Sequence, residues 1–432
     1  MNTFFHIFLD PNVQFVWFGC VLFGISSGVL GSFAFLRKRA LLGDAIAHAA
    51  LPGVCLAFLF TQSKNPYALI IGASVTSLIA SMFVQTISRK SRIKEDTAIA
   101  LILSVFFAVG IVLLTMIQHK PLGNQSGLDK FLFGQTASLV SADVKVFAVL
   151  AFVLLLVVAF TYKELKALCF DRGFAESLGM PMRFIDTLLT LLIVLVVTTG
   201  LQAVGVVLMA AMLITPAAAA RLWTNRLSLM LVLAGVFGAL AGSSGVVMST
   251  LAPRMPTGPW IVMAITFVFA VSLLISPQRG MLSLWLRHRK QKNKIQKENI
   301  LLTFARYAEE GFYQFSLDQL RSIRNYNVRR ALYLLRNLQK ENLLLLGDLP
   351  ETWVFTQSGK ERAFALLRRH RLWELYLSRY LDLSSEHVHT DAENIEHILT
   401  LELEAELVKV LENPTHDPHH HPIPPQKGKA YE

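Results

Sequence analysis

The sequence predicts an all-α polytopic membrane domain of eight to nine transmembrane helices, followed by a separate soluble part. The chain of 432 residues is 53% hydrophobic and only 16% charged, whereas about a quarter of the residues of a soluble protein are charged. Residues 13–276 form one apolar run after another, and residues 277–432 hold a large share of the charge. Part of the net charge of +11 gathers in short loops, which favours membrane topology over DNA binding as its first explanation.

Nine segments approach the roughly 20 apolar residues that a membrane-spanning helix needs. They are residues 13–36, 42–61, 66–88, 96–117, 141–162, 184–199, 201–221, 228–250 and 258–276. Two of these segments are short or close together, so one of them could be re-entrant. The three cysteines form no CxxC motif, and the first segment has no basic region or cleavage site beside it. We therefore expect neither a disulfide framework nor a cleaved signal peptide.

The distribution of Lys and Arg predicts the orientation of this multi-pass domain in the cell (inner) membrane. Every second connection is basic, at residues 37–39, 89–94, 163–183 and 221–226, so the basic connections all lie on one side of the membrane. The positive-inside rule makes this basic side cytoplasmic. A further basic stretch, 287–294, follows the last span, so the C-terminal part is expected in the cytoplasm. Nine spans would leave the N-terminus outside, and eight would leave it inside.

Two ionisable residues lie inside a predicted span, where each costs about 2.5–3.5 kcal/mol at the bilayer centre. Asp44 and His48 are four residues apart, so they share one face of the helix 42–61. A carboxylate together with an imidazole suits a divalent transition metal. The alternative, from spacing alone, is that both side chains are hydrated at the membrane surface. Simple topology places Asp44 near the cytoplasmic edge, whereas a transport site should lie deeper.

The segment 169–181, CFDRGFAESLGMP, is polar and lies between two predicted spans on the cytoplasmic side. A short helix that ends near Gly179 could dock there on a partner protein, although the segment also suits an ordinary loop. The sequence contains no GxxxxGKS or GxxxxGKT motif, which forms the phosphate-binding loop of many ATPases. Any ATP-driven step therefore needs a separate subunit.

Several stretches together resemble the permease subunit of the ABC importers for manganese, zinc and iron. In the family's order they are FLRKRALLGDAIAHAALPGV, KEDTAIALILSVFFAVGIVL, FLFGQTASL, FAESLGMP, VGVVLMAAMLITPAAAARL and PTGPWIVM, and they cover almost all of residues 10–280. The resemblance implies a transport subunit rather than an enzyme. Its implied partners are a second permease subunit (in a homo- or heterodimer), a cytoplasmic ABC ATPase on each half, an extracytoplasmic metal-binding protein and the lipid bilayer.

The same resemblance assigns roles to particular residues. Asp44 and His48 match the family's D-x-x-x-H and would help to form the metal site in the transport path. The segment 171–181, with Glu176 and Gly179, would be the helix that couples the permease to its ATPase. ATP would thus be used only through the partner subunit.

Residues 297–355 predict a winged helix. Residues 297–313 have the pattern of a helix, and SLDQLRSIRNYNVRRALYLLRNLQKENLLLL gives two more with a polar break near 325–327. Two short β-like runs then surround a GDLP turn, and helix, turn, helix and hairpin make a winged helix. Its second helix carries Arg329, Arg330 and Arg336. These arginines suit contact with DNA, and the alternative is a winged helix that serves only protein contacts.

The stretches RRHRLWELYLSRYLDLSSEHVHTDAENIEHILT and LENPTHDPHHHPIPP resemble the diphtheria-toxin-repressor family of metal-dependent regulators, including its manganese-responsive branch. The similarity covers residues 297–425. It implies metal-binding dimerisation helices with two metal positions. The primary or paired site would use His370, Glu393, Glu396 and His397, and an accessory site would use His370, Glu374 and His389.

Departures from that family pattern bear on the choice of metal. Acidic ligands from the first helix of the family would fall at Glu298 and Leu301, and Leu301 cannot bind a metal. Position 393 is cysteine in iron-responsive members but glutamate here, and an oxygen donor suits Mn²⁺ better than a thiolate does. The histidines of the ending HDPHHHPIP, namely His416, His419, His420 and His421, are left out of the predicted site because this ending mostly packs against the domain in the family.

Three functional hypotheses follow, and the third is that the C-terminal domain serves only dimerisation or stability, as the gap at Leu301 allows. The leading one is a permease subunit for Mn²⁺, or less favourably Fe²⁺ or Zn²⁺, whose cytoplasmic domain senses the same metal and slows transport. The alternative is a metal-dependent DNA-binding repressor that is membrane-anchored or released by proteolysis. The expected parts are a permease domain (1–280), a basic linker (281–296), a winged helix (297–365), metal-binding and dimerisation helices (366–425) and a tail (426–432).

Overall fold

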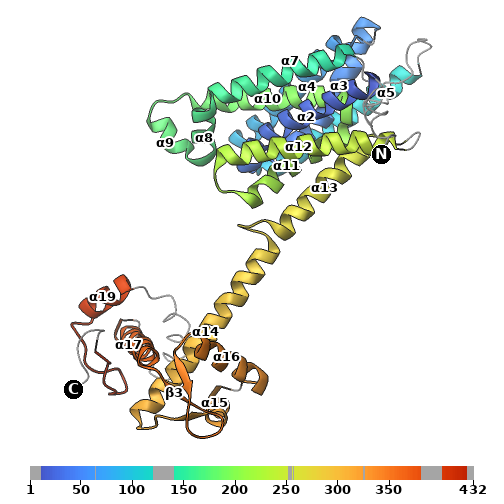
Figure 1. The fold of residues 1–432 in the computed structure, drawn as a ribbon. Coiled ribbons are helices and arrows are strands. Elements are labelled where there is room, and N and C mark those ends of the chain that lie inside the picture. The colour runs from blue at the N-terminus through green and yellow to red at the C-terminus, as the bar shows by residue number, and fades with distance from the viewer. Residues whose placement is uncertain are drawn as a thin grey trace. The chain divides into compact units, whose positions relative to one another are not determined.

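The structure, a computed structural model, describes residues 11–63, 65–119, 141–251, 255, 257–324, 326–380 and 401–425 (Figure 1). The chain divides into two compact units, Met1–Leu284 and Trp285–Glu432. The predicted sensor ligands His389, Glu393, Glu396 and His397 lie outside the described residues.

The first unit is a bundle of helices. They are α2 (Pro11–Leu36), α3 (Leu42–Thr61), α4 (Pro66–Lys90), α5 (Glu95–Gln118), α7 (Ser141–Phe160), α8 (Tyr162–Phe170), α9 (Arg172–Ser177), α10 (Met182–Val204), α11 (Val206–Trp223), α12 (Leu227–Thr250) and α13 (Thr257–Ile275). Each of the nine predicted segments is helical. Within the described part of the chain, seven helices are long and apolar enough to cross a membrane, or eight if α7 and α8, which meet at a 69° bend, form one span.

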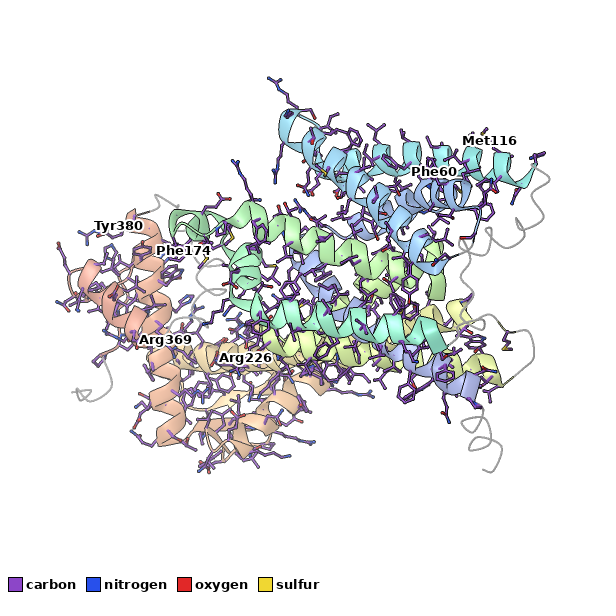
Figure 2. The ribbon with its side chains drawn as sticks, turned by 90° about the horizontal axis from the view of Figure 1, so that it is seen from above. Phe60, Met116, Phe174, Arg226, Arg369 and Tyr380 are labelled. Atoms are coloured by element: carbon purple, nitrogen blue, oxygen red, sulfur yellow. The ribbon has the colours of Figure 1, made fainter. Side chains whose placement is uncertain are left out.

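The outer surface of this bundle is apolar. Phe60 on α3 and Met116 on α5, both labelled in Figure 2, are 86% and 54% exposed. Large exposed hydrophobic side chains recur along α4, α5 and α7. Such a surface suits lipid, because lipid tails are as apolar as the side chains themselves. The first unit is therefore the multi-pass membrane domain that the sequence predicts.

The contact between α2 and α12 depends on glycine. A Cβ atom built on Gly24 would lie 2.3 Å from the carbonyl oxygen of Gly238, and one built on Gly238 would lie 2.0 Å from the carbonyl oxygen of Gly24. No side chain fits in so short a distance. Small residues let membrane helices approach closely and so gain van der Waals contact.

Replacing Gly238 by alanine is expected to destabilise the membrane domain by about 1–3 kcal/mol, the usual cost of overpacking. The new methyl group would force α12 away from α2. Thermal unfolding of the purified protein in detergent would measure the loss. Gly235→Ala is the matched control on α12, since its Cβ would lie 3.5 Å from the nearest atom, an ordinary contact. Equal unfolding temperatures for the two variants would contradict the prediction.

The second unit contains a small mixed fold. Its elements are α14 (Met281–Glu309), β1 (Phe315–Ser316), α15 (Leu317–Arg324), α16 (Val328–Lys340), β2 (Leu344–Leu346), β3 (Thr352–Phe355), α17 (Gln357–Tyr380) and α19 (Leu401–Val410). The strands form an antiparallel sheet in the order β1-β3-β2. The predicted helix pair and hairpin of a winged helix are confirmed. The helix predicted for 297–313 begins earlier, at Met281, because the Lys, Arg and Gln residues before it also favour helix.

Aromatic and leucine side chains build the core of this unit. The rings of Phe304 on α14 and Phe315 on β1 stack with centroids 4.2 Å apart. Leu301 is 1% exposed in the same core. The polar break between α15 and α16 has a local cause, because the side chain of Asn327 accepts a hydrogen bond from the backbone N–H of Arg329 and caps α16.

Candidate functional site

Helix α3 brings Asp44 and His48 together. Asp44 lies in the first turn, and His48 follows one turn later. Their Oδ1 and Nε2 atoms are 3.4 Å apart, and the side chains are 33% and 19% exposed. Two ligands about 2.1 Å from one cation stand about 3.0–3.4 Å apart when they subtend 90–109° at the ion. The pair is thus spaced as two donors to one metal ion.

The imidazole of His48 has a further unusual feature. Its Nδ1 atom is buried and has no hydrogen-bond partner among the residues that the structure describes. The ring packs edge-on against Phe107 of α5 with centroids 4.8 Å apart. A buried polar atom without a partner is costly and calls for an explanation. A cation bound to the other nitrogen, Nε2, which faces Asp44, would leave Nδ1 without a partner, so the orphaned atom is not itself a sign of a metal.

The coupling segment predicted at 171–181 forms the short helix α9. Asp171 caps it by accepting a hydrogen bond from the backbone N–H of Phe174 at 2.9 Å. Arg172 pairs with Glu176 one turn later at 2.9 Å. Gly179 follows with φ of 78°, a left-handed conformation that glycine adopts readily. Phe174, labelled in Figure 2, is 62% exposed, so this short helix presents an aromatic ring at the surface.

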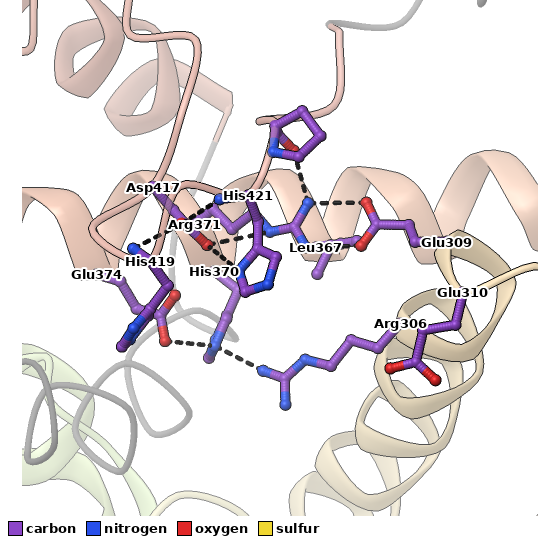
Figure 3. Close-up of a pocket in the computed structure, with 11 residues that line it drawn as sticks. Arg306, Glu309, Glu310, Leu367, His370, Arg371, Glu374, Asp417, His419 and His421 are labelled. Atoms are coloured by element: carbon purple, nitrogen blue, oxygen red, sulfur yellow. Dashed lines mark hydrogen bonds and ion pairs between the residues drawn. The ribbon is translucent and has the colours of Figure 1, made fainter.

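The second unit holds a cavity of about 760 Å³ between α14, α17 and the segment 417–422 (Figure 3). Its lining is strongly charged. It includes Arg306, Glu309, Glu310, His370, Arg371, Glu374, Asp417, His419 and His421. The cavity therefore gathers carboxylates and imidazoles from three separate parts of this unit.

Two predicted sensor ligands meet in this cavity. His370 and Glu374 are 1% and 3% exposed, and His370 Nε2 lies 3.0 Å from Glu374 Oε1. The guanidinium of Arg306 donates to the same Nε2 at 2.8 Å. Arginine has only donors and an ionised carboxylate has only acceptors, so this ring nitrogen lies between a cationic and an anionic side chain. A side-chain cation from α14 therefore stands beside the nitrogen that a metal ion would need.

A second network fastens the C-terminal segment to the cavity wall. Arg371 makes two hydrogen bonds to the carboxylate of Glu309, at 2.7 and 2.6 Å, and lies 3.4 Å from Asp417 Oδ2. The backbone N–H groups of His419 and His421 both donate to Asp417 Oδ1 at 2.8 Å. These two histidines, left out of the predicted metal site, thus line the same cavity as His370.

The predicted donor Glu298 does not line this cavity. Its carboxylate pairs instead with Lys294 at 4.0 Å and with Arg362 at 3.6 Å. Glu309 and Glu310, about three turns further along α14, line the cavity in its place. Across the described residues, no three His, Cys, Asp or Glu side chains have the arrangement of a complete metal site.

The arginines of α16 differ in their surroundings. Arg330 hydrogen-bonds Gln296 at 3.0 Å and also contacts Asn293, both on α14. Arg329 and Arg336 are exposed. One of the three residues singled out for DNA contact is therefore engaged within the protein, and the other two lie at the surface.

Comparisons with known proteins agree with this architecture. The model of the ABC 3 transport family matches residues 10–276, and the model of the iron dependent repressor, metal binding and dimerisation domain matches residues 356–425. The chain therefore belongs to the ABC 3 transport family and carries a repressor-type metal-binding and dimerisation domain at its C-terminal end.

Two related proteins and one solved structure show this similarity in detail. The chain is 42% identical over 375 residues to the manganese transport system membrane protein MntC of Bacillus subtilis, an alignment that covers 87% of this chain and 86% of the relative. It is 41% identical to the zinc transport system membrane protein TroC of Treponema pallidum, covering 67% of this chain and 97% of that protein. Among solved structures, PsaBC from Streptococcus pneumoniae in complex with Fab matches with a TM-score of 0.59 and 34% identity, covering 66% of this chain and 99% of that one.

Proposed function

We propose that this chain is the permease subunit of an ABC importer for a divalent transition metal, with Mn²⁺ as the first candidate and Fe²⁺ or Zn²⁺ as the second. The observation that carries the proposal is the Asp44–His48 pair, an oxygen and a nitrogen donor 3.4 Å apart on one membrane helix. A carboxylate oxygen suits Mn²⁺, and an imidazole nitrogen is accepted by Mn²⁺, Fe²⁺ and Zn²⁺ alike. The similarity to proteins named for manganese and zinc transport supports the same class of cargo.

In this proposal the membrane domain works as one half of a paired permease. An extracytoplasmic binding protein delivers the ion, Asp44 and His48 hold it within the bundle, and a cytoplasmic ATPase that contacts α9 drives its passage. His48 lies one turn along α3 from Asp44, so the two donors can hold the ion together. Uptake of radioactive Mn²⁺ by cells that express the permease with its ATPase tests the cargo, with Fe²⁺ and Zn²⁺ as competitors. Uptake insensitive to excess unlabelled Mn²⁺ would reject manganese as the substrate.

The C-terminal unit, in this proposal, is a cytoplasmic sensor of the transported metal. His370 and Glu374 supply two donors 3.0 Å apart in a buried, charged cavity. An imidazole and a carboxylate are donors that suit a divalent cation, and a bound metal would supply charge neutralisation between the carboxylates of this cavity. The match of residues 10–276 to a transport family supports this reading over a DNA-binding repressor.

Replacing residues 174–179 by a Gly/Ser sequence is expected to separate ATP hydrolysis from transport. The exposed Phe174 and the capped helix α9 would no longer give the ATPase a rigid contact, whereas the ATPase itself keeps every residue that hydrolyses ATP. Uptake should fall at least tenfold, and hydrolysis by the ATPase alone should continue. Both would be measured in proteoliposomes. Co-purification of the ATPase with the altered permease and normal uptake would show that α9 is not the coupling element.

A further inference from the structure

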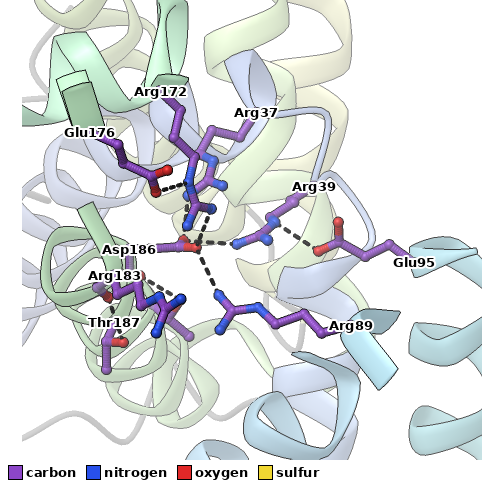
Figure 4. Close-up of polar contacts among 10 residues, drawn as sticks. Arg37, Arg39, Arg89, Glu95, Arg172, Glu176, Arg183, Asp186 and Thr187 are labelled. Carbon is purple, nitrogen blue, oxygen red and sulfur yellow. Dashed lines mark hydrogen bonds and ion pairs between the residues drawn. The ribbon is translucent and has the colours of Figure 1, made fainter. Parts of the chain in front are cut away.

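A buried carboxylate gathers four arginines at one end of the membrane bundle (Figure 4). Asp186, in the second turn of α10, is 1% exposed. Its Oδ1 atom contacts Arg37 and lies 3.0 Å from Arg39, and its Oδ2 atom lies 3.5 Å from Arg172 and 3.7 Å from Arg89. No step of the transport path proposed above uses this group.

The four arginines come from three separate places in the fold. Arg37 follows the last residue of α2, Arg39 lies in the connection to α3, Arg89 is in the last turn of α4, and Arg172 opens α9. One carboxylate is therefore the common partner of the coupling helix α9, of the connection between α2 and α3, and of α4. One or two arginines would suffice to stabilise the buried carboxylate. That four arginines meet it indicates that Asp186 also links the segments that carry them.

The cluster is also not neutral. Glu95 pairs with Arg39 at 2.7 Å, and Glu176 pairs with Arg172 at 2.9 Å. Three carboxylates thus face four guanidinium groups. Without the charge of Asp186, Arg37 and Arg39 would repel each other most, because their side chains are only 11% and 15% exposed and charges in such sites are weakly screened.

A short covalent path leads from this cluster to the metal donors. The backbone N–H of Leu42, the first residue of α3, donates to the carbonyl oxygen of Arg39 at 3.2 Å. Asp44 follows two residues later. A displacement of α9 would be transmitted through Arg172, Asp186 and Arg39 to the start of the helix that carries Asp44 and His48.

We propose that Asp186 is a positioning residue that transmits the motion of the coupling helix α9 to the metal-binding end of α3. This inference rests on the proposed function, since it needs both a transported cation and an ATPase that contacts α9. Asp186 itself touches neither. Its carboxylate holds Arg172 and Arg39 in one rigid group, so that the two segments move together.

The test uses the complete transporter, with its ATPase and binding protein, in proteoliposomes. The quantity measured is the number of Mn²⁺ ions taken up per ATP hydrolysed. Asp186→Asn keeps the shape of the side chain but removes its charge, and it should lower this ratio at least tenfold while hydrolysis stays within twofold of the wild type. Asp186→Glu keeps the charge and should restore part of the ratio. The control is Arg226→Gln, an exposed arginine labelled in Figure 2 that lies outside the cluster and should leave the ratio unchanged.

If Asp186 only stabilised the fold, its substitution would have a different effect on the two measured rates. Uptake and hydrolysis would then fall together, in proportion to the folded protein, and the ratio would stay constant, which would overturn the inference. Should Asp186→Asn fail to fold, Arg172→Gln removes only the branch to α9, and it too should lower the ratio; an unchanged ratio there would equally overturn the inference. A wild-type complex that shows no ATP-dependent uptake would instead reject the proposed function on which the inference rests.

Discussion

Asp44→Ala and His48→Ala are each expected to reduce ATP-dependent manganese uptake by about 100-fold or more. Loss of residues that merely support a metal ligand already costs about 10–100-fold in affinity or activity, and the proposed ligands themselves should cost more. Each substitution removes one of two donors that stand 3.4 Å apart on α3. Uptake of radioactive Mn²⁺ by cells measures the effect, and immunodetection in the membrane fraction shows that the protein is present.

Matched controls are available on another helix of the same domain. Asp96 in the first turn of α5 and His119 just after its end are exposed. Asp96→Ala and His119→Ala remove the same chemical groups at the membrane surface and should leave uptake within twofold of the wild type. Normal uptake in both Asp44→Ala and His48→Ala would remove this pair from the transport path.

The fold of the membrane domain was predictable because each membrane span can be recognised from its own stretch of sequence. About 20 consecutive apolar residues suffice to predict a membrane helix, and every one of the nine segments is helical in the structure. The ends were less predictable. The predicted boundary between 199 and 201 falls at Gly205, where φ of 87° separates α10 from α11. Strand β1 has only two residues, too few for any alternating pattern.

The candidate sites were predictable where their members are close in sequence. Asp44 with His48, and His370 with Glu374, are each four residues apart, and helical geometry alone brings each pair together. Asp186 was missed because its partners lie far along the chain. The sequence did contain a signal, namely a lone carboxylate at the start of an apolar span. Intramembrane carboxylates are rare and usually have a partner.

The cavity of the second unit shows a further limit of reasoning from the sequence. Spacing and resemblance predicted the donors His370 and Glu374, but not the cation that they face. Arg306 lies 64 residues from His370, and only the packing of α14 against α17 brings them together. Similarly, Glu298 is an acidic residue at a family position, but its side chain pairs with Arg362 rather than facing the cavity.

The arrangement in this cavity predicts how metal controls transport. His370→Gln with Glu374→Gln should leave uptake intact at low internal manganese but remove its slowing at high internal manganese. Both donors would then be lost, whereas the membrane path would be unchanged. Glu396→Ala with His397→Ala, which changes the other proposed ligands, should behave in the same way. The measurement is uptake into vesicles preloaded with a series of Mn²⁺ concentrations.

Arg306→Gln should have the opposite effect, with slowing that begins at about tenfold lower internal manganese. In the structure the guanidinium lies 2.8 Å from Nε2 of His370, so an incoming metal ion must first displace it. Removing the positive charge takes away both this competitor and its repulsion of a divalent ion. Arg336→Gln is the matched control, since Arg336 is exposed on α16 and lies outside the cavity. If Arg306→Gln left the onset unchanged, the guanidinium would not compete with metal. If the paired substitutions also kept the slowing, metal control of transport through this domain would be rejected, and DNA binding would become the leading role for the second unit.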